Sequence, residues 1–97
     1  MAATLTTYVV RHEPTGNTIP ALYGKRGGSH CEPCDPATQS PRIWRSARSA
    51  RAWLTVWLKG KVTSHSDNSG DVWLEISPQP HRKAEEMKVV EVKIELP

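Results

Sequence analysis

The chain lacks several features that would assign it quickly to a class of protein. It has no phenylalanine, only two cysteines and an apolar fraction of 37% in 97 residues. No apolar run approaches the roughly 18 residues that a membrane-spanning helix needs. Residues 1–7 lack the basic and apolar parts of a signal peptide. We therefore expect a cytosolic protein with no membrane association and with reduced cysteines.

Acidic residues are absent between Asp35 and Asp67. The positive charge of the chain, which has a net charge of +3, is concentrated in that same stretch, at Arg42, Arg45, Arg48, Arg51, Lys59 and Lys61. A positive segment of this kind attracts phosphate groups or acidic surfaces.

The sequence also frames no catalytic acid, base and nucleophile together. Ser46 or Ser49 with His30 or His65 would make a dyad, but nothing in the sequence orients a base. We therefore predict that the protein is not an enzyme and has no catalytic residues and no cofactor.

What the sequence contains favours one α+β domain over residues 1–97. Residues 47–59 place apolar side chains at helical spacing, and this segment is the one helix predicted. Ser46 is suited to cap its first turn, and Gly60 can take the left-handed conformation that ends it. Much of the core volume must come from four tryptophans in place of phenylalanine: Trp44, Trp53, Trp57 and Trp73.

Two strands are predicted before the helix. Residues 8–12 and 18–23 should form a hairpin around a turn at residues 14–17, with Pro20 placing the second strand at an edge. Residues 1–6 are expected to be a frayed start.

Two further strands are predicted after the helix. Residues 71–76 and 88–96 alternate apolar and polar side chains. Residues 61–70 are interpreted as a loop and residues 82–87 as one helical turn. The predicted order is ββ-α-ββ, with the helix on one face of a four- to five-stranded, mainly antiparallel sheet.

Residues 24–40 form a long loop rich in glycine and proline, and loops of this length are often functional. Within it, Cys31 and Cys34 could supply two ligands of a tetrahedral zinc site. Other ligands would have to come from histidines that are not at zinc-finger spacing, so the favoured interpretation is a loop with two thiols and no metal. A small zinc-stabilised domain remains an alternative.

An anion site is predicted at the start of the helix. The unpaired backbone N–H groups of the first turn and nearby arginines can hold a phosphate, and the glycines of residues 24–28 could fold back over it. The candidate ligand residues are Ser29, His30, Arg42, Arg45, Ser46, Arg48 and Ser49. The competing interpretation is a solvated helix face.

The layout resembles a group of small proteins of tailed bacteriophages that has no assigned activity. The stretches that carry the resemblance are YVVRHEPTG (8–16), SHCEP (29–33), PRIWRSARSARAWL (41–54), WLKG (57–60) and MKVVEV (87–92). The Cys-x-x-Cys pair departs from the pattern of that group. The resemblance implies a phage origin and an accessory role.

These observations lead to a ranked set of functions. The first is a non-catalytic accessory protein in the host cytoplasm that neutralises a host component, in the manner of a counter-defence protein. Its ligand would be a phosphorylated small molecule, or an acidic host protein that meets Arg51, Trp53 and Trp73. An exposed indole would favour homo-oligomers. The alternative is a nucleic-acid-binding module that uses the basic helix and its interleaved tryptophans.

Overall fold

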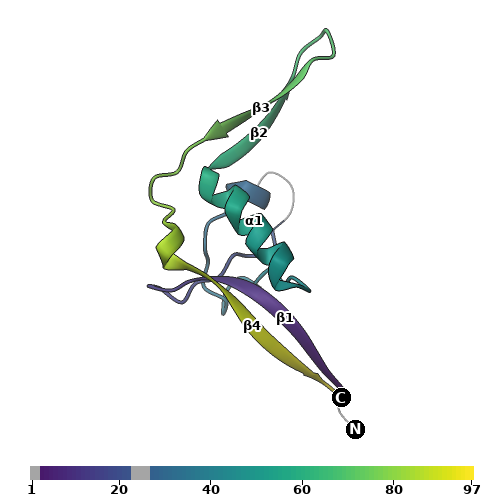
Figure 1. Ribbon diagram of the computed structural model, residues 1–97, viewed down its shortest axis with the longest axis vertical. Helices are drawn as coiled ribbons and strands as arrows, with labels where there is room; N and C mark the ends of the chain where they lie inside the picture. The colour runs from purple at the N-terminus through teal and green to yellow at the C-terminus, as the bar shows by residue number, and fades with distance from the viewer. Residues whose placement is uncertain (1–2, 23–26) are drawn as a thin grey trace.

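The computed structural model describes residues 3–22 and 27–97 and confirms an α+β fold with one α-helix. The molecule is elongated, 59 × 29 × 25 Å, and two β-ribbons extend from opposite ends of a small body that contains the helix (Figure 1). In chain order the elements are β1 (Ala3–His12), the 3-10 helix η2 (Gly28–His30), α1 (Ala47–Lys59), β2 (Lys61–Ser66), β3 (Val72–Ser77), the 3-10 helix η3 (Ala84–Glu86) and β4 (Met87–Leu96).

The predicted helix and both of its ends are confirmed. The Ser46 hydroxyl accepts a hydrogen bond from the backbone N–H of Ser49 at 3.1 Å, which satisfies one of the unpaired donors of the first turn. Gly60 follows α1 with φ +129°, and a β-carbon there would overlap the backbone oxygen of Ser77. Glycine is therefore required both by the backbone conformation and by the close approach of the chain.

The frayed start predicted for residues 1–6 is wrong from Ala3 onward. β1 begins at Ala3 and pairs antiparallel with β4 along its whole length, from Ala3 opposite Leu96 to His12 opposite Met87. Threonine-rich alternating sequence suits a ribbon strand, and the regular alternation of β4 offers it a partner from the far end of the chain. The two strands of this sheet are therefore the first and the last strands of the chain.

The predicted hairpin between residues 8–12 and 18–23 is only partly formed over residues 8–22, and residue 23 lies outside the described residues. A turn is present, with Gly16 at φ +75°, and the Ile19 N–H donates to the Val10 oxygen at 2.9 Å. Residues 18–22 make only isolated bridges, because Thr18 pairs with both Arg11 and Cys34. The two edges of this segment are shared between different neighbours, so no second strand develops.

The loop predicted for residues 61–70 is also wrong in its first part. Lys61–Ser66 forms β2, which pairs antiparallel with β3 from Lys61 opposite Ser77 to Ser66 opposite Val72. The strand predicted at residues 71–76 is confirmed as β3. Asp67 organises the connecting turn by accepting hydrogen bonds from Ser69 and Asp71.

The described residues therefore form two separate two-stranded sheets, β1–β4 and β2–β3, and not the single four- to five-stranded sheet predicted. The single helical turn predicted for residues 82–87 is confirmed as η3, and the strand at residues 88–96 as β4.

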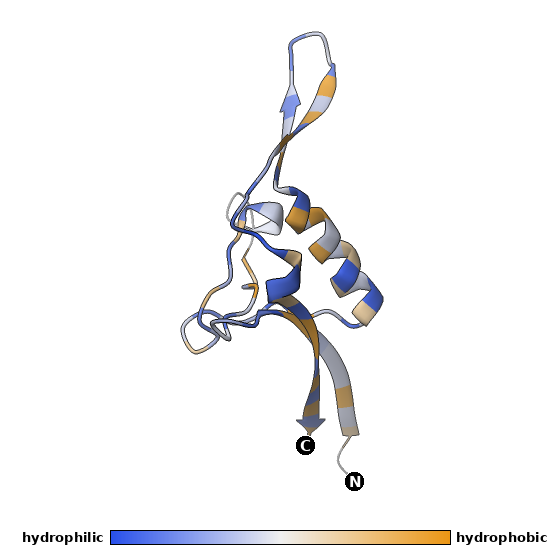
Figure 2. Cartoon of the chain, turned by 60° about the vertical axis from the view of Figure 1, so that its left-hand side comes forward, coloured by the Kyte–Doolittle hydropathy of each residue, from blue (hydrophilic) through white to orange (hydrophobic). Residues whose placement is uncertain are grey.

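The core lies where α1 packs on the inner ends of β1 and β4. Its buried residues include Val10, Ile19, Trp44, Ala50 and Trp57. The expectation that tryptophan replaces phenylalanine holds for Trp44 and Trp57, which are 7% and 1% exposed. Figure 2 shows apolar residues as bands on α1 and on the ribbons, including β3, which lies away from this core.

Candidate functional site

A pocket of about 270 Å³ lies beside the C-terminal half of α1, between the end of β1 and the segment before η3. Its base is apolar and its rim carries ionisable side chains, a combination that is common in ligand sites. The lining residues are His12, Thr15, Asn17, Glu32, Pro33, Trp57, His81, Arg82, Lys83 and Met87.

Arg82 is the central charge of this region, and its side chain is fully buried. Its Nε donates to Glu32 Oε2 at 2.9 Å, and its Nη1 donates to the Trp57 backbone oxygen at 2.9 Å. The guanidinium also lies 4.2 Å from the centre of the Trp57 ring. A buried cation needs an opposite charge beside it and acceptors for its N–H groups, and these contacts supply both. The bond to Trp57 also satisfies a backbone oxygen in the last turn of α1.

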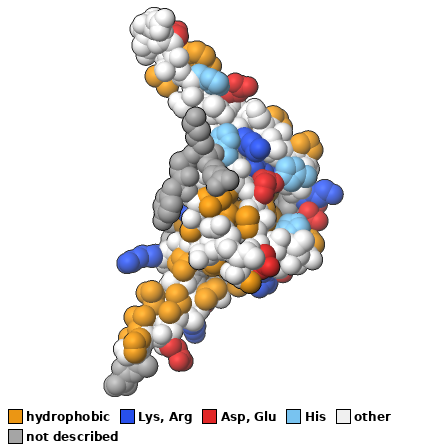
Figure 3. All heavy atoms as spheres, turned by 180° about the vertical axis from the view of Figure 1, so that it is seen from behind, with side chains coloured by type: hydrophobic (Ala, Val, Ile, Leu, Met, Phe, Trp, Pro, Cys, Tyr) orange, Lys and Arg blue, Asp and Glu red, His pale blue; other side chains and the backbone are white. Residues whose placement is uncertain are grey.

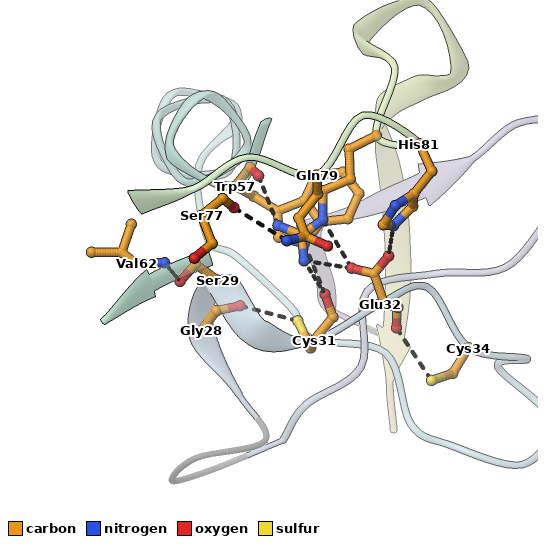
Figure 4. Close-up of polar contacts among 11 residues, drawn as sticks. Gly28, Ser29, Cys31, Glu32, Cys34, Trp57, Val62, Ser77, Gln79 and His81 are labelled. Carbon is orange, nitrogen blue, oxygen red and sulfur yellow. Dashed lines mark hydrogen bonds and ion pairs between the residues drawn. The ribbon is translucent and has the colours of Figure 1, made fainter. Parts of the chain in front are cut away.

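Trp57 and Cys31 hold the other side of this network. The indole Nε1 of Trp57 donates to the Cys31 backbone oxygen at 2.8 Å, and Arg82 Nη2 lies 3.4 Å from that same oxygen. The polar contacts around Cys31, Glu32, Trp57 and His81 are drawn in Figure 4. The loop at residues 31–32 is therefore fastened to α1 and to residues 81–82 by polar bonds.

Two histidines stand at the rim of the pocket, each beside a carboxylate. His81 Nε2 contacts the second oxygen of Glu32, and His12 Nε2 lies 3.6 Å from Glu86. The pocket can therefore hold a small polar group beside these two imidazole–carboxylate contacts. Sequence reasoning missed this site, because Glu32 and Arg82 are 50 positions apart and neither belongs to a recognisable motif.

The two cysteines are engaged with backbone carbonyls and not with each other. The Cys31 thiol donates to the Gly28 oxygen at 3.1 Å and the Cys34 thiol to the Glu32 oxygen at 3.3 Å (Figure 4). Burial raises the pKa of the Cys31 thiol, which favours the protonated form. In residues 3–22 and 27–97 no three histidine, cysteine, aspartate or glutamate side chains are grouped to hold a metal, so the zinc alternative gains no support.

The predicted anion site is divided between the two ends of α1. Ser29 accepts from the Val62 N–H at 2.8 Å, and His30 Nε2 donates to the Val62 oxygen at 2.9 Å. Val62 lies beyond the C-terminal end of α1, and at the usual helical rise the whole of α1 separates it from Ser46. Ser29 and His30 therefore do not join the arginines at the helix start. Of the glycine-rich stretch that was predicted to fold back over the helix start, residues 28–30 form η2, which bonds to Val62 at the other end of α1. Residues 24–26 of that stretch lie outside the described residues.

At the helix start, three of the predicted ligands already have partners within the protein. The Ser46 hydroxyl caps the helix and donates to Ser49 Oγ at 2.9 Å. Arg42 lies 4.7 Å from the centre of the Trp44 ring. It also lies 5.7 Å from the centre of the Trp53 ring, so its charge rests against two indoles.

The other arginines predicted in this region, Arg45, Arg48 and Arg51, are exposed, and no ion pair to them occurs within the described part of the chain. We call these three residues the arginine cluster.

The predicted partner surface of Arg51, Trp53 and Trp73 is not contiguous. Trp53 is half-buried and packs between Trp44 and Trp57, with ring centres 5.3 and 6.1 Å away. Trp73 lies on the β2–β3 hairpin, which projects beyond the C-terminal end of α1 (Figure 1). It is 49% exposed there and stacks on His65.

The β2–β3 hairpin presents an apolar face that sequence reasoning missed. Residues directly opposite in an antiparallel pair share a face, so Ile76 is opposite Val62 while Leu74 and Val72 are opposite serines. Val72, Leu74 and Ile76 are 68%, 67% and 49% exposed. We call Val62, Val72, Leu74 and Ile76 the hairpin face.

Comparison with known proteins returned no match among protein families, among curated proteins or among solved structures. Across the described residues, no helix has both the length and the apolar character needed to cross a membrane.

Proposed function

We propose that this chain is a non-catalytic bacteriophage accessory protein that binds and neutralises a host protein in the host cytoplasm. The hairpin face is the contact surface in this proposal. The observation that carries it is the exposure of Val72, Leu74 and Ile76 in one row on β3.

The physical basis of this proposal is the low stability that the hairpin would have on its own. A two-stranded hairpin without a third strand or a packed helix has marginal stability in water. Soluble proteins rarely leave a contiguous apolar surface open unless it contacts a partner. Burial of these large aliphatic side chains against a partner would stabilise both the complex and the hairpin itself.

The charge of the chain defines the chemistry of the partner. The net charge is +3, and no residue of the arginine cluster forms an ion pair within the described residues. Long-range attraction then favours an acidic partner and raises its association rate. We therefore propose an acidic host protein with an apolar groove that accepts the hairpin face.

A protein partner is favoured over a phosphorylated small molecule because Ser29 and His30 lie at the other end of α1 from the arginines. It is favoured over nucleic acid because Trp44 is buried and Trp53 is packed between two other indoles under Arg42. Neither ring is open to stack on a base, which is the contact that single-stranded binding uses.

The experiment is affinity capture from nuclease-treated bacterial lysate, with quantitative mass spectrometry of the bound proteins. The test variant is Leu74→Thr/Ile76→Thr. The matched control is Ile43→Thr/Val56→Thr, which makes the same kind of chemical change at residues that are 52% and 46% exposed outside the hairpin.

The proposal predicts one acidic host protein that the wild type and the control retain and the hairpin variant loses. Binding of that purified protein should weaken as salt increases, because steering by the arginine cluster is screened. Equal capture by both variants, or capture that disappears with the nuclease treatment, contradicts the proposal.

A further inference from the structure

We propose that two copies of this chain associate by antiparallel pairing of their β4 edges, with the two-fold axis at Val92. The result would be a four-stranded sheet in the order β1–β4–β4–β1. This inference is independent of the hairpin face and rests on the backbone and charges of β4.

The outer edge of β4 is long and regular. One edge pairs with β1 without interruption, and no strand in the described residues pairs with the other. In Figure 1 no ribbon of the described residues lies alongside the outer half of β4 on that side. Exposed edges of this length are usually protected by proline, a bulge, a covering segment or charged side chains such as lysine. β4 has neither a proline nor a break in its register, and the charged residues on its edge are of both signs.

The β1 hydrogen bonds show which residues of β4 face outward. Tyr8, Val10 and His12 bond away from β4, to the Trp44, Ile19 and Asn17 backbones. In an antiparallel pair, directly opposite residues either both face each other or both face away. Glu91 and Val89, which lie opposite Tyr8 and Val10, therefore turn their backbone N–H and C=O groups away from β1. Because these directions alternate along a strand, the backbone groups on the outer edge belong to Val89, Glu91, Lys93 and Glu95.

The charges on this edge select one register. With the axis at Val92, Glu91 lies opposite Lys93 of the second copy, and Lys93 lies opposite Glu91 of the second copy. Moving the axis to Glu91 or Lys93 places like charges opposite each other, which destabilises cross-strand pairs. The Val92 register also retains the longest overlap of the registers that oppose unlike charges, so β4 is self-complementary in this one arrangement.

The other face of the ribbon supports the same pairing. Its outer part is apolar, with Leu5, Val92 and Leu96 at 40%, 36% and 42% exposed. Figure 3 shows apolar side chains gathered on this end of the molecule. Pairing at Val92 would place Val90 opposite Ile94 of the second copy and join the two apolar rows into one surface.

The bodies would lie far apart along the shared sheet. Each body is attached at the Met87 end of β4, next to η3. Because the two β4 strands would run antiparallel, the two bodies would lie at opposite ends of the shared sheet.

The test is sedimentation equilibrium on the full chain with Glu91→Lys, Lys93→Glu and the double substitution. Each single substitution creates two like-charge pairs in the dimer, which should weaken dimerisation about tenfold or more. The double substitution restores opposite charges and should return the dissociation constant to within about threefold of the wild type. An equimolar mixture of the two single variants should form a heterodimer.

Charge-matched controls separate register from net charge. Glu95→Lys changes a residue opposite Val89 of the second copy, and Lys88→Glu changes one opposite Leu96, so both should dimerise like the wild type. A wild type that stays monomeric throughout the accessible concentration range overturns the proposal. Weakening by the controls equal to that of the single variants, or a double variant that is not restored, also overturns it.

Discussion

The buried guanidinium of Arg82 donates from Nε to the Glu32 carboxylate at 2.9 Å, although the two residues are 50 positions apart. The same side chain donates to the Trp57 backbone at the end of α1. The Arg82 side chain therefore connects the segment before η3 to the loop after η2 through an ion pair and to the helix through a hydrogen bond.

Arg82→Met should destabilise the protein by about 3 kcal/mol, because truncating one partner of a buried pair leaves the other groups unsatisfied. Glu32→Gln should cost less, since the Glu32 side chain is 41% exposed and water can replace part of the interaction. Urea unfolding of the two single variants and the double variant measures the coupling between them. Additive effects, with no coupling, would show that the pair does not act as a unit.

Gly60→Ala should destabilise the protein by about 3 kcal/mol or more. The added β-carbon would overlap the Ser77 backbone oxygen, and φ is +129°, a region that only glycine adopts easily. The matched control is Gly16→Ala, where φ is +75° but nothing lies within 4 Å. This control should cost only about 1 kcal/mol, the strain of a left-handed backbone alone. Thermal unfolding compares them, and equal losses would contradict the close contact between the end of α1 and β3.

The two cysteines should differ in reactivity. Cys31 is 4% exposed and its pKa is raised by burial, so its thiol stays protonated to higher pH than an ordinary cysteine. Alkylation of the native protein with iodoacetamide in mildly alkaline buffer, read by mass spectrometry of peptides, should modify Cys34 well before Cys31. In denaturant the two rates should converge. Faster modification of Cys31 in the native state would be inconsistent with its position in the core.

Acid should loosen the β2–β3 turn only at low pH. Hydrogen bonds from Ser69, with the hydroxyl the largest contribution, hold the pKa of Asp67 below its usual value of 3.8. A carboxylate with a lowered pKa stabilises the fold above its unfolded-state pKa, and that contribution is lost as pH falls through the lower folded value. The Ser69 amide shift in an NMR titration should therefore change with a midpoint below pH 3.8. In Asp67→Asn this transition should disappear, whereas a wild-type midpoint at or above 3.8 would contradict the turn geometry.

Local sequence patterns correctly predicted the helix and strands whose signals lie within their own residues. The helix from Ala47 to Lys59 has its apolar spacing, its serine cap and its glycine stop within residues 46–60. β3 and β4 show the alternation typical of strands. β2 was missed because its sequence, KVTSHS, is polar, and it is a strand only through its pairing with β3.

Long-range relationships could not be predicted in the same way. The pairing of β1 with β4 joins the two ends of the chain, and both strands would also fit other partners. The predicted anion site grouped residues by their closeness in sequence to Ser46, whereas Ser29 and His30 bind the backbone beyond the opposite end of α1. Arg82 lies in a segment that looks like an ordinary polar turn, and only the fold makes it buried.

The most direct test of the central claim is native mass spectrometry of the protein isolated gently from bacterial cells that express it. The account predicts a complex with an acidic host protein that is present for the wild type and for Ile43→Thr/Val56→Thr, and absent for Leu74→Thr/Ile76→Thr. A bare mass in every sample, or an added mass of small-molecule size that survives the hairpin substitutions, would contradict it.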